Sequence, residues 1–107
     1  MTPLRGEIWL ADLGIAGKVR PVIIVSRDDP APPRALTIFV PVTTQNRRSN
    51  YEVELPQLTF LQAGSVANVQ GIASLPESRF VRKLGNLRTN ALASIEQALL
   101  FALNMAA

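Results

Sequence analysis

Short hydrophobic stretches, separated by turn-forming residues, make up most of the chain. Six stretches rich in β-branched and aromatic residues alternate with clusters of glycine, proline and small polar residues, a pattern typical of strands joined by turns. The predicted strands are residues 7–13, 21–26, 36–42, 51–55, 65–69 and 80–84. Short strands at this spacing, with no helix between them, predict a mainly β fold, a small antiparallel barrel or sandwich.

Three stretches allow more specific predictions. Residues 21–26 (PVIIVS) are continuously apolar rather than alternating, which predicts a strand buried on both faces. Pro41 lacks a backbone N–H, so it predicts an edge position or a bulge in its strand. Residues 74–77 (SLPE) have the pattern of a capping box and predict a brief helical turn capped by Ser74.

The end of the chain has a different period. From Thr89 or Asn90 onward, apolar residues recur every three or four positions in a segment rich in Ala and Leu, at Leu92, Ile95, Leu99 and Leu103. We therefore expect one C-terminal helix packed against the β domain.

Composition restricts the possible chemistry. A chain of 107 residues is expected to form one domain, residues 1–107, and its 48% hydrophobic content excludes a disordered chain. Because there is no Cys and no His, a disulfide framework, a thiol nucleophile and an imidazole general base are all excluded. We expect no cofactor and no metal. No apolar run is long enough for a membrane span and no signal pattern is present, so we expect a cytoplasmic protein.

The basic residues suggest an anionic partner. The net charge is +3, and nine of the eleven basic residues are Arg, which binds carboxylates and phosphates through paired hydrogen bonds. Two groups of polar residues stand at strand ends, where a scaffold can fix them for binding. The candidate site residues are Lys18, Arg20, Thr43, Thr44, Gln45, Arg47, Arg48 and Gln70. The alternatives are a solvated strand-end cation at Arg20 and an ordinary polar hairpin loop at 43–48, while Asp28-Asp29 is better explained as a turn than as a metal site.

One reaction suits these residue types. RNA carries its own nucleophile, the 2′-hydroxyl, so cleavage by transesterification needs no protein nucleophile and no metal. Arg20 could clamp the phosphate and stabilise its developing charge, and Thr43 could hold the phosphate or the 2′-hydroxyl. Antiparallel pairing of residues 21–26 with 36–42 would bring these two residues together. Thr44 would then point to the opposite face, as neighbouring strand residues do.

Several stretches resemble the MazF/PemK/Kid toxins. RGEIWLADL (residues 5–13) resembles their R-G-[DE]-[IV]-[WY] opening, and VRPVIIVS (19–26) their R-P-v-v-v-v-S strand. VPVTTQNRR (40–48) is similar to their a-P-[IV]-T-s-x-x-R segment. The likeness continues in order through YEVEL (51–55), SRFVRKLGNL (78–87) and IEQALLFAL (95–103), and so covers nearly the whole chain.

The resemblance implies a small SH3-like antiparallel barrel with a C-terminal helix, acting as a homodimer. Members of the family are metal-independent endoribonucleases (mRNA interferases) that cut single-stranded RNA at short sequences, leaving a 2′,3′-cyclic phosphate and a 5′-hydroxyl. A cognate antitoxin protein blocks them. The family's catalytic Arg falls on Arg20 and its Thr or Ser on Thr43.

Two features depart from the family pattern. The link Gly14–Gly17 is short, and Gln70 and Ala73 stand where the family has an acidic group and an Arg. Two other functions are therefore kept as alternatives: a catalytically weak relative that binds RNA or an antitoxin, and a gyrase-poison-like inhibitor on the same fold. The gyrase poisons carry a Trp near the C-terminus, whereas the only Trp here is Trp9.

Overall fold

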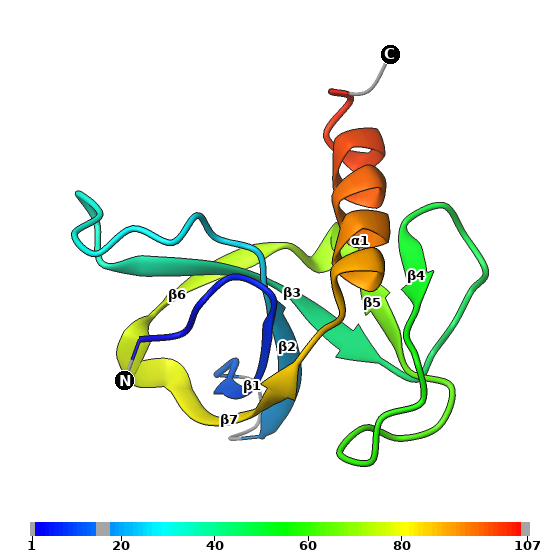
Figure 1. The fold of residues 1–107 in the computed structure, drawn as a ribbon, viewed down its shortest axis with the longest axis horizontal. Coiled ribbons are helices and arrows are strands. Elements are labelled where there is room, and N and C mark those ends of the chain that lie inside the picture. Colours follow the sequence, from blue (N-terminus) through cyan, green and yellow to red (C-terminus); the bar gives the residue numbers. More distant parts are fainter. Residues whose placement is uncertain (1, 15–17, 106–107) are drawn as a thin grey trace.

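The computed structural model describes residues 2–14 and 18–105. The described residues form seven strands, two short 3₁₀ turns and one helix (Figure 1). The strands are β1 (Glu7–Asp12), β2 (Val19–Ile24), β3 (Leu36–Thr43), β4 (Glu52–Glu54), β5 (Val66–Asn68), β6 (Ala73–Pro76) and β7 (Phe80–Asn86). The 3₁₀ turns are η1 (Val69–Gly71) and η2 (Glu77–Arg79), and the helix is α1 (Thr89–Ala102). All six predicted strands and the terminal helix are therefore confirmed, with small shifts at their ends.

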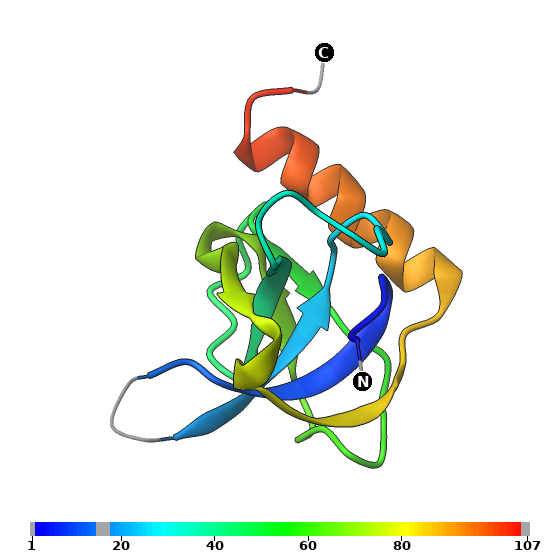
Figure 2. The ribbon, with the colours of Figure 1, turned by 90° about the vertical axis from the view of Figure 1, so that its left-hand side faces the viewer.

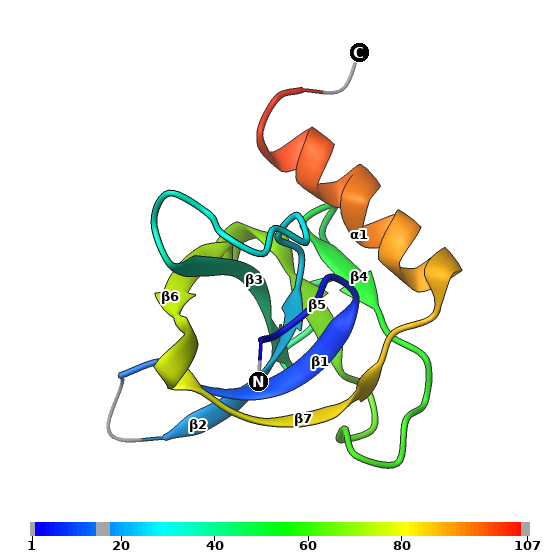
Figure 3. The ribbon, with the colours of Figure 1, turned by 60° about the vertical axis from the view of Figure 1, so that its left-hand side comes forward.

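All strand pairs are antiparallel. The order across the sheet is β4-β5-β3-β2-β1-β7, and β6 pairs with the first half of β3. Because η2 joins β6 directly to β7, strands β6, β3, β2, β1 and β7 follow one another in a ring. Figure 3 shows these strands curling round. The mainly β antiparallel fold is confirmed, although among the described strands β4 and β7 remain unpaired with each other, so hydrogen bonds do not close the sheet into a barrel.

The sheet has an apolar core on each face. On one face, Trp9, Val22 and Ile24 pack with Phe39 and Phe80, whose rings meet edge to face at a centroid distance of 6.0 Å. The other core contains Ile8, Ile23, Val25 and Val40 from the central part of the sheet, Ala67 of β5 and the buried face of the helix at Ile95 and Ala98. Residues 22–25 therefore contribute alternately to two cores, which explains why this stretch is continuously apolar.

Helix α1 covers the second of these cores. Its Ile95 and Ala98 are buried, and the helix contacts β4 and η1. Figure 2 shows it lying obliquely over the strands. Leu103, predicted as part of the buried stripe, caps the helix instead and is 52% exposed. Within the described residues, no helix has both the length and the apolar character needed to span a membrane.

Two local predictions need correction. Strand β3 is not an edge strand, because it pairs with β2 on one side and with β6 and then β5 on the other. Pro41 lies where that second partner changes from β6 to β5, so its missing N–H interrupts neither pairing. Ser74 is not a helix cap: it lies within β6, opposite Ile38, and the turn η2 that follows is preceded by Pro76 without any side-chain cap.

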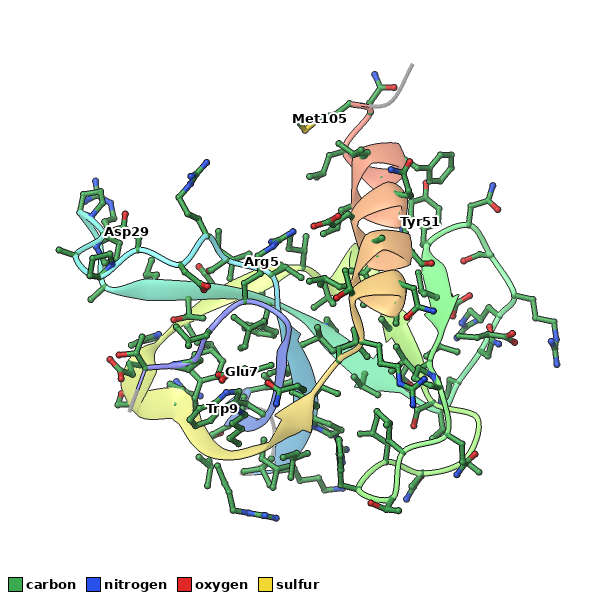
Figure 4. All side chains as sticks on the ribbon, viewed as in Figure 1. Arg5, Glu7, Trp9, Asp29, Tyr51 and Met105 are labelled. Carbon is green, nitrogen blue, oxygen red and sulfur yellow. The ribbon has the colours of Figure 1, made fainter. Side chains whose placement is uncertain are left out.

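Two ion pairs involve the N-terminal segment: Arg5 with Glu96, and Glu7 with Lys83. These four residues are called the N-terminal ion-pair cluster below. Glu7 is 9% exposed, and its carboxylate accepts hydrogen bonds from Leu4 N at 2.7 Å and Trp9 Nε1 at 3.0 Å, with Lys83 Nζ at 2.9 Å. Arg5 bridges the carbonyl of Val25 and the carboxylate of Glu96, and so ties the helix to the sheet (Figure 4). Burial raises the pKa of Glu7, but the Lys83, Leu4 and Trp9 donors together hold this pKa below its usual value.

Candidate active site

Arg20 of β2 and Thr43 at the end of β3 lie on neighbouring strands and line one cavity. In the β2–β3 register, Val22 faces Pro41, Ile23 faces Val40 and Ile24 faces Phe39. These pairs end two residues short of Arg20 on β2 and two residues short of Thr43 on β3, in the same direction along the sheet. The cavity that both residues line has a volume of about 660 Å³. The structure thus brings together the two residues that the sequence proposed as a catalytic pair.

This cavity, called the Arg20 cavity below, is basic and partly apolar. Its lining contains two arginines, several hydroxyl and amide groups, one aromatic ring and no carboxylate. The lining residues are Leu10, Arg20, Pro21, Val42, Thr43, Thr44, Gln45, Phe60, Leu61, Gln62, Ser65, Arg82 and Leu84. Such a lining favours a ligand that is anionic and also has flat apolar surfaces, as a nucleotide has.

Arg20 has no partner for its charge among the described residues. The side chain is exposed, and among the described residues no carboxylate pairs with it and no side chain or carbonyl accepts a hydrogen bond from it. On β2 it stands opposite Ala11 of β1, a residue without polar atoms in its side chain. All five guanidinium N–H groups therefore remain available to an anion entering the cavity.

Thr43 is the last residue of β3, and its hydroxyl fixes the start of the following loop. Its Oγ1 accepts a hydrogen bond from Gln45 N at 3.1 Å, which leaves the hydroxyl proton free to be donated. Thr44 lies beyond the strand and lines the same cavity as Thr43. The expectation that strand alternation would separate these two threonines is therefore wrong, because the strand has ended.

Arg47 and Arg48 lie in the loop after β3, outside the lining of the cavity. Glu52 organises this loop: its carboxylate accepts from Arg47 N at 3.0 Å and from Ser49 N at 3.0 Å. These backbone donors lower the pKa of Glu52. Arg48 Nη1 lies 3.8 Å from Glu54 Oε2, and both side chains are largely exposed, so the pair is weak.

Lys18 and Gln70 also lie outside the lining. Lys18 is exposed and follows residues 15–17 of the short glycine link, which are outside the described residues. Gln70 is exposed in η1, where its N–H donates to Asn68 Oδ1. The next residue, Gly71, packs so closely on Pro41 that an added Cβ would lie 2.6 Å from the proline ring.

The acidic pair Asp28-Asp29 forms a turn, as predicted. Asp28 Oδ1 accepts from Arg5 N at 2.7 Å, and Asp29 Oδ1 accepts from Ala31 N at 3.0 Å. Figure 4 shows Asp29 at the far end of the β2–β3 connection. Across residues 2–14 and 18–105, acidic side chains nowhere gather in a group of three that could hold a metal ion.

A second cavity of about 640 Å³ lies between the N-terminal segment and the β2–β3 connection. Its lining includes Arg27 but also Asp28, Asp29 and Glu77, so acidic groups outnumber basic ones. A polyanion is disfavoured there. The charge balance of the two linings therefore selects the Arg20 cavity as the candidate site.

Sequence reasoning missed Arg82, Phe60 and Gln62. Arg82 was seen only as part of the closing strand: it pairs with Leu10, which pairs with Pro21, but this register does not show that its side chain shares a cavity with Arg20. Phe60 and Gln62 come from the long β4–β5 connection, whose path the local pattern does not fix.

Comparison with known proteins agrees with this site and fold. Residues 4–103 match the family model of the PemK-like, MazF-like toxin of type II toxin-antitoxin systems. The probable endoribonuclease MazF5 of Mycobacterium tuberculosis (strain ATCC 25618 / H37Rv) is 33% identical over 86 residues, covering 79% of this chain and 78% of that protein.

Solved structures superpose over nearly the whole chain. An endoribonuclease in complex with its cognate antitoxin from a mycobacterial species has a TM-score of 0.86 at 26% identity and covers 99% of both chains. The Mycobacterium tuberculosis toxin MazF-mt6 has a TM-score of 0.81 at 25% identity and covers 94% of this chain and 99% of its own. With its family match over residues 4–103 and a relative at this level of identity, the chain belongs to the PemK-like, MazF-like toxins of type II toxin–antitoxin systems.

Proposed function

We propose that this toxin is a metal-independent endoribonuclease that cleaves single-stranded RNA, including mRNA, at specific short sequences in the Arg20 cavity. One observation carries the proposal: Arg20 and Thr43 line the same cavity, whose described lining contains a second arginine and no carboxylate. Family membership and the endoribonucleases among its relatives support the same activity. The expected place of action is the cytoplasm, where mRNA is found.

The proposed reaction is a transesterification. The 2′-oxygen of one nucleotide attacks the neighbouring phosphorus while the bond to the 5′-oxygen breaks, giving a 2′,3′-cyclic phosphate and a 5′-hydroxyl. Arg20 donates hydrogen bonds to the phosphate oxygens on which charge develops, and Thr43 donates its hydroxyl proton to the same phosphate. Because the lining has no carboxylate or imidazole, the 2′-hydroxyl proton leaves to solvent and the 5′-oxygen takes a proton back from solvent.

The protein is proposed to work as a homodimer. Several large apolar side chains remain exposed on the described part of the chain, among them Phe101 at 47%, Leu103 at 52% and Met105 at 68%. They lie at the end of α1 and beyond it, where Figure 4 shows Met105 furthest from the sheet. An apolar group of this kind is typical of a surface covered by another chain.

A cognate antitoxin is the second proposed partner. The mycobacterial neighbour was solved with its antitoxin bound. Since the Arg20 cavity carries two unpaired arginines, an acidic antitoxin segment would compete with RNA for it. Simultaneous binding of antitoxin and RNA to one site would contradict this.

Of the two alternatives, the gyrase-poison function is not favoured, because the similar proteins are endoribonucleases. The weak relative remains an outcome to be tested. Ala73, which stands where the family has an Arg, lies on β6 outside the lining of the Arg20 cavity.

The test is cleavage of a long, defined RNA by the purified protein in EDTA, with mapping of the product ends. We expect cleavage at a small set of sites, with 2′,3′-cyclic phosphate and 5′-hydroxyl ends. Arg20→Ala protein prepared in parallel controls for contaminating nuclease. Cleavage that requires Mg²⁺, or no cleavage of any RNA, would overturn the proposal.

A further inference from the structure

The Arg20 cavity contains a second guanidinium that the proposed reaction does not use. Arg82 of β7 pairs with Leu10 of β1, and Leu10 pairs with Pro21 of β2, next to Arg20. Strand β1 thus lies between the two arginine-bearing strands, so their backbones are two strand spacings, about 10 Å, apart. Both residues line the cavity from strands separated by β1, a spacing that suits two different phosphates of one RNA strand.

The charge of Arg82 is not used to hold the fold. The described ion pairs involve Arg5, Arg48, Arg79 and Lys83, and Arg82 takes part in none of them. The contrast with Lys83 is informative, because that neighbour is bound to the buried carboxylate of Glu7. Arg82 is exposed and lines the cavity, so its guanidinium can bind a ligand without breaking a described ion pair.

An aromatic ring and an amide stand in the same cavity. Phe60 lies against Gly85 of β7, where an added Cβ would come within 2.7 Å of its ring, so the backbone of β7 positions the ring. The carbonyl of Gln62 accepts from Ser65 N at 3.2 Å and from Ser65 Oγ at 2.6 Å. These bonds fix the turn, while the side-chain amide of Gln62 bonds to no other described residue.

We propose that Arg82, Phe60 and Gln62 form a subsite for the nucleotide next to the cleaved bond. Arg82 binds the phosphate adjacent to the one held by Arg20, the ring of Phe60 stacks on the base, and the Gln62 amide hydrogen-bonds its edge. Phe60 is partly buried against the core, and its ring also lines the cavity together with the Arg82 guanidinium. A guanidinium and an aromatic ring are the two contacts that single-stranded nucleic acids use most. The subsite rests on the proposed function, because it requires RNA to be cut at Arg20.

The test measures kcat and KM for cleavage of the defined RNA at several salt concentrations. Arg82→Ala should raise KM about tenfold, the effect of losing one charge-assisted hydrogen-bond pair, while kcat changes less than about threefold. It should also make the slope of log(1/KM) against log salt concentration less negative by about 0.7, because one phosphate contact with a single strand is lost. Arg34→Ala, another exposed arginine that lines neither cavity, is the matched control and should change neither quantity.

Phe60→Leu tests the ring while keeping an apolar side chain against Gly85. It should raise KM by about fivefold or more and weaken the base preference at one position beside the cut, as loss of stacking does. If Arg82→Ala and Phe60→Leu both behave like Arg34→Ala, the subsite is refuted while the proposed function stands. A wild-type protein that cleaves no RNA, or an Arg20→Ala variant that cleaves normally, refutes the proposed function and the subsite with it.

Discussion

The Arg20 cavity and the N-terminal ion-pair cluster use similar side chains for opposite purposes. In the cluster, Arg5 and Lys83 each contact a carboxylate, and their side chains are only about one-third exposed, at 33% and 34%. In the cavity, Arg20 and Arg82 are exposed and the lining has no carboxylate. A basic residue paired with a carboxylate holds elements together, whereas one without a described partner is available to a ligand.

The difference can arise between adjacent residues. Arg82 and Lys83 are neighbours on β7, so their side chains leave opposite faces of the strand. Lys83 reaches Glu7, and Arg82 lines the cavity. Residue type and position in the sequence therefore do not separate a structural cation from a binding one; the face of the strand does.

The largest effect is expected at Arg20. Arg20→Ala should lower the single-turnover cleavage rate about 10²–10³-fold, because a preorganised charge stabiliser is removed. Arg20→Lys should lower the cleavage rate by a similar factor, since the charge stays but the planar geometry that makes two parallel hydrogen bonds is lost. Urea denaturation should show little change in stability for either variant. Arg5→Ala is the reverse control. It should unfold at a lower urea concentration, and the folded protein should still cleave RNA.

The next effect concerns the cluster. Glu7→Gln removes the ion pair with Lys83 and weakens the bonds from Leu4 N and Trp9 Nε1, and should lower the free energy of unfolding by about 1–3 kcal/mol. Glu54→Gln is the matched control, because its weak exposed pair with Arg48 is worth less than about 0.5 kcal/mol. Equal urea midpoints for the two variants would show that burial does not distinguish these carboxylates.

Thr43 should have a smaller effect on cleavage. Thr43→Ala is expected to reduce the rate about tenfold to a hundredfold, because it removes a hydrogen-bond donor to the phosphate and frees the Gln45 N–H. Thr43→Ser keeps the hydroxyl and should reduce the cleavage rate least. Thr37→Ala, at the other end of β3, should cleave at the wild-type rate. If Thr43→Ala cleaves at the wild-type rate while Thr37→Ala cleaves more slowly, the reaction takes place near Thr37 and the proposed site is contradicted.

The smallest effect is a pH dependence of stability. The pKa of Glu7 is lowered in the folded protein, so the unfolded chain binds this proton more tightly. The contribution of Glu7 is complete above its unfolded pKa of about 4.3 and is lost as the pH falls below that value and through the lowered folded pKa. Urea midpoints measured over this range should fall less steeply for Glu7→Gln than for the wild type, and parallel curves would contradict the assignment.

Much of the fold follows from local pattern. The continuous apolar run of β2, the three-to-four-residue period of α1 and the juxtaposition of Arg20 with Thr43 all follow from periodicity and antiparallel pairing. Pro41 was misjudged because the partner change along β3 depends on two distant segments. Ser74 was misjudged because β6 pairs with β3 and overrides a weak helical signal.

The missed half of the site has a similar cause. Alternation along β7 separates Arg82 from Lys83 but does not say which face opens to a cavity. Phe60 depends on the path of the β4–β5 connection, which is fixed by tertiary contacts such as that with Gly85. Short-range patterns specify strands and their faces, whereas convergence of side chains from distant loops requires the packed structure.

The most direct test of the contrast between free and paired cations is an NMR titration of the arginine Nε–Hε signals. A single-stranded RNA with 2′-O-methyl groups at every position serves as ligand, because it lacks the nucleophile and cannot be cleaved. The signals of Arg20 and Arg82 should shift most and with the same apparent Kd, while those of Arg5 and Arg79, which are paired with Glu96 and Asp12, stay in place. Shifts confined to Arg5, Arg79 or the Arg47–Arg48 loop, with Arg20 unchanged, would contradict the account.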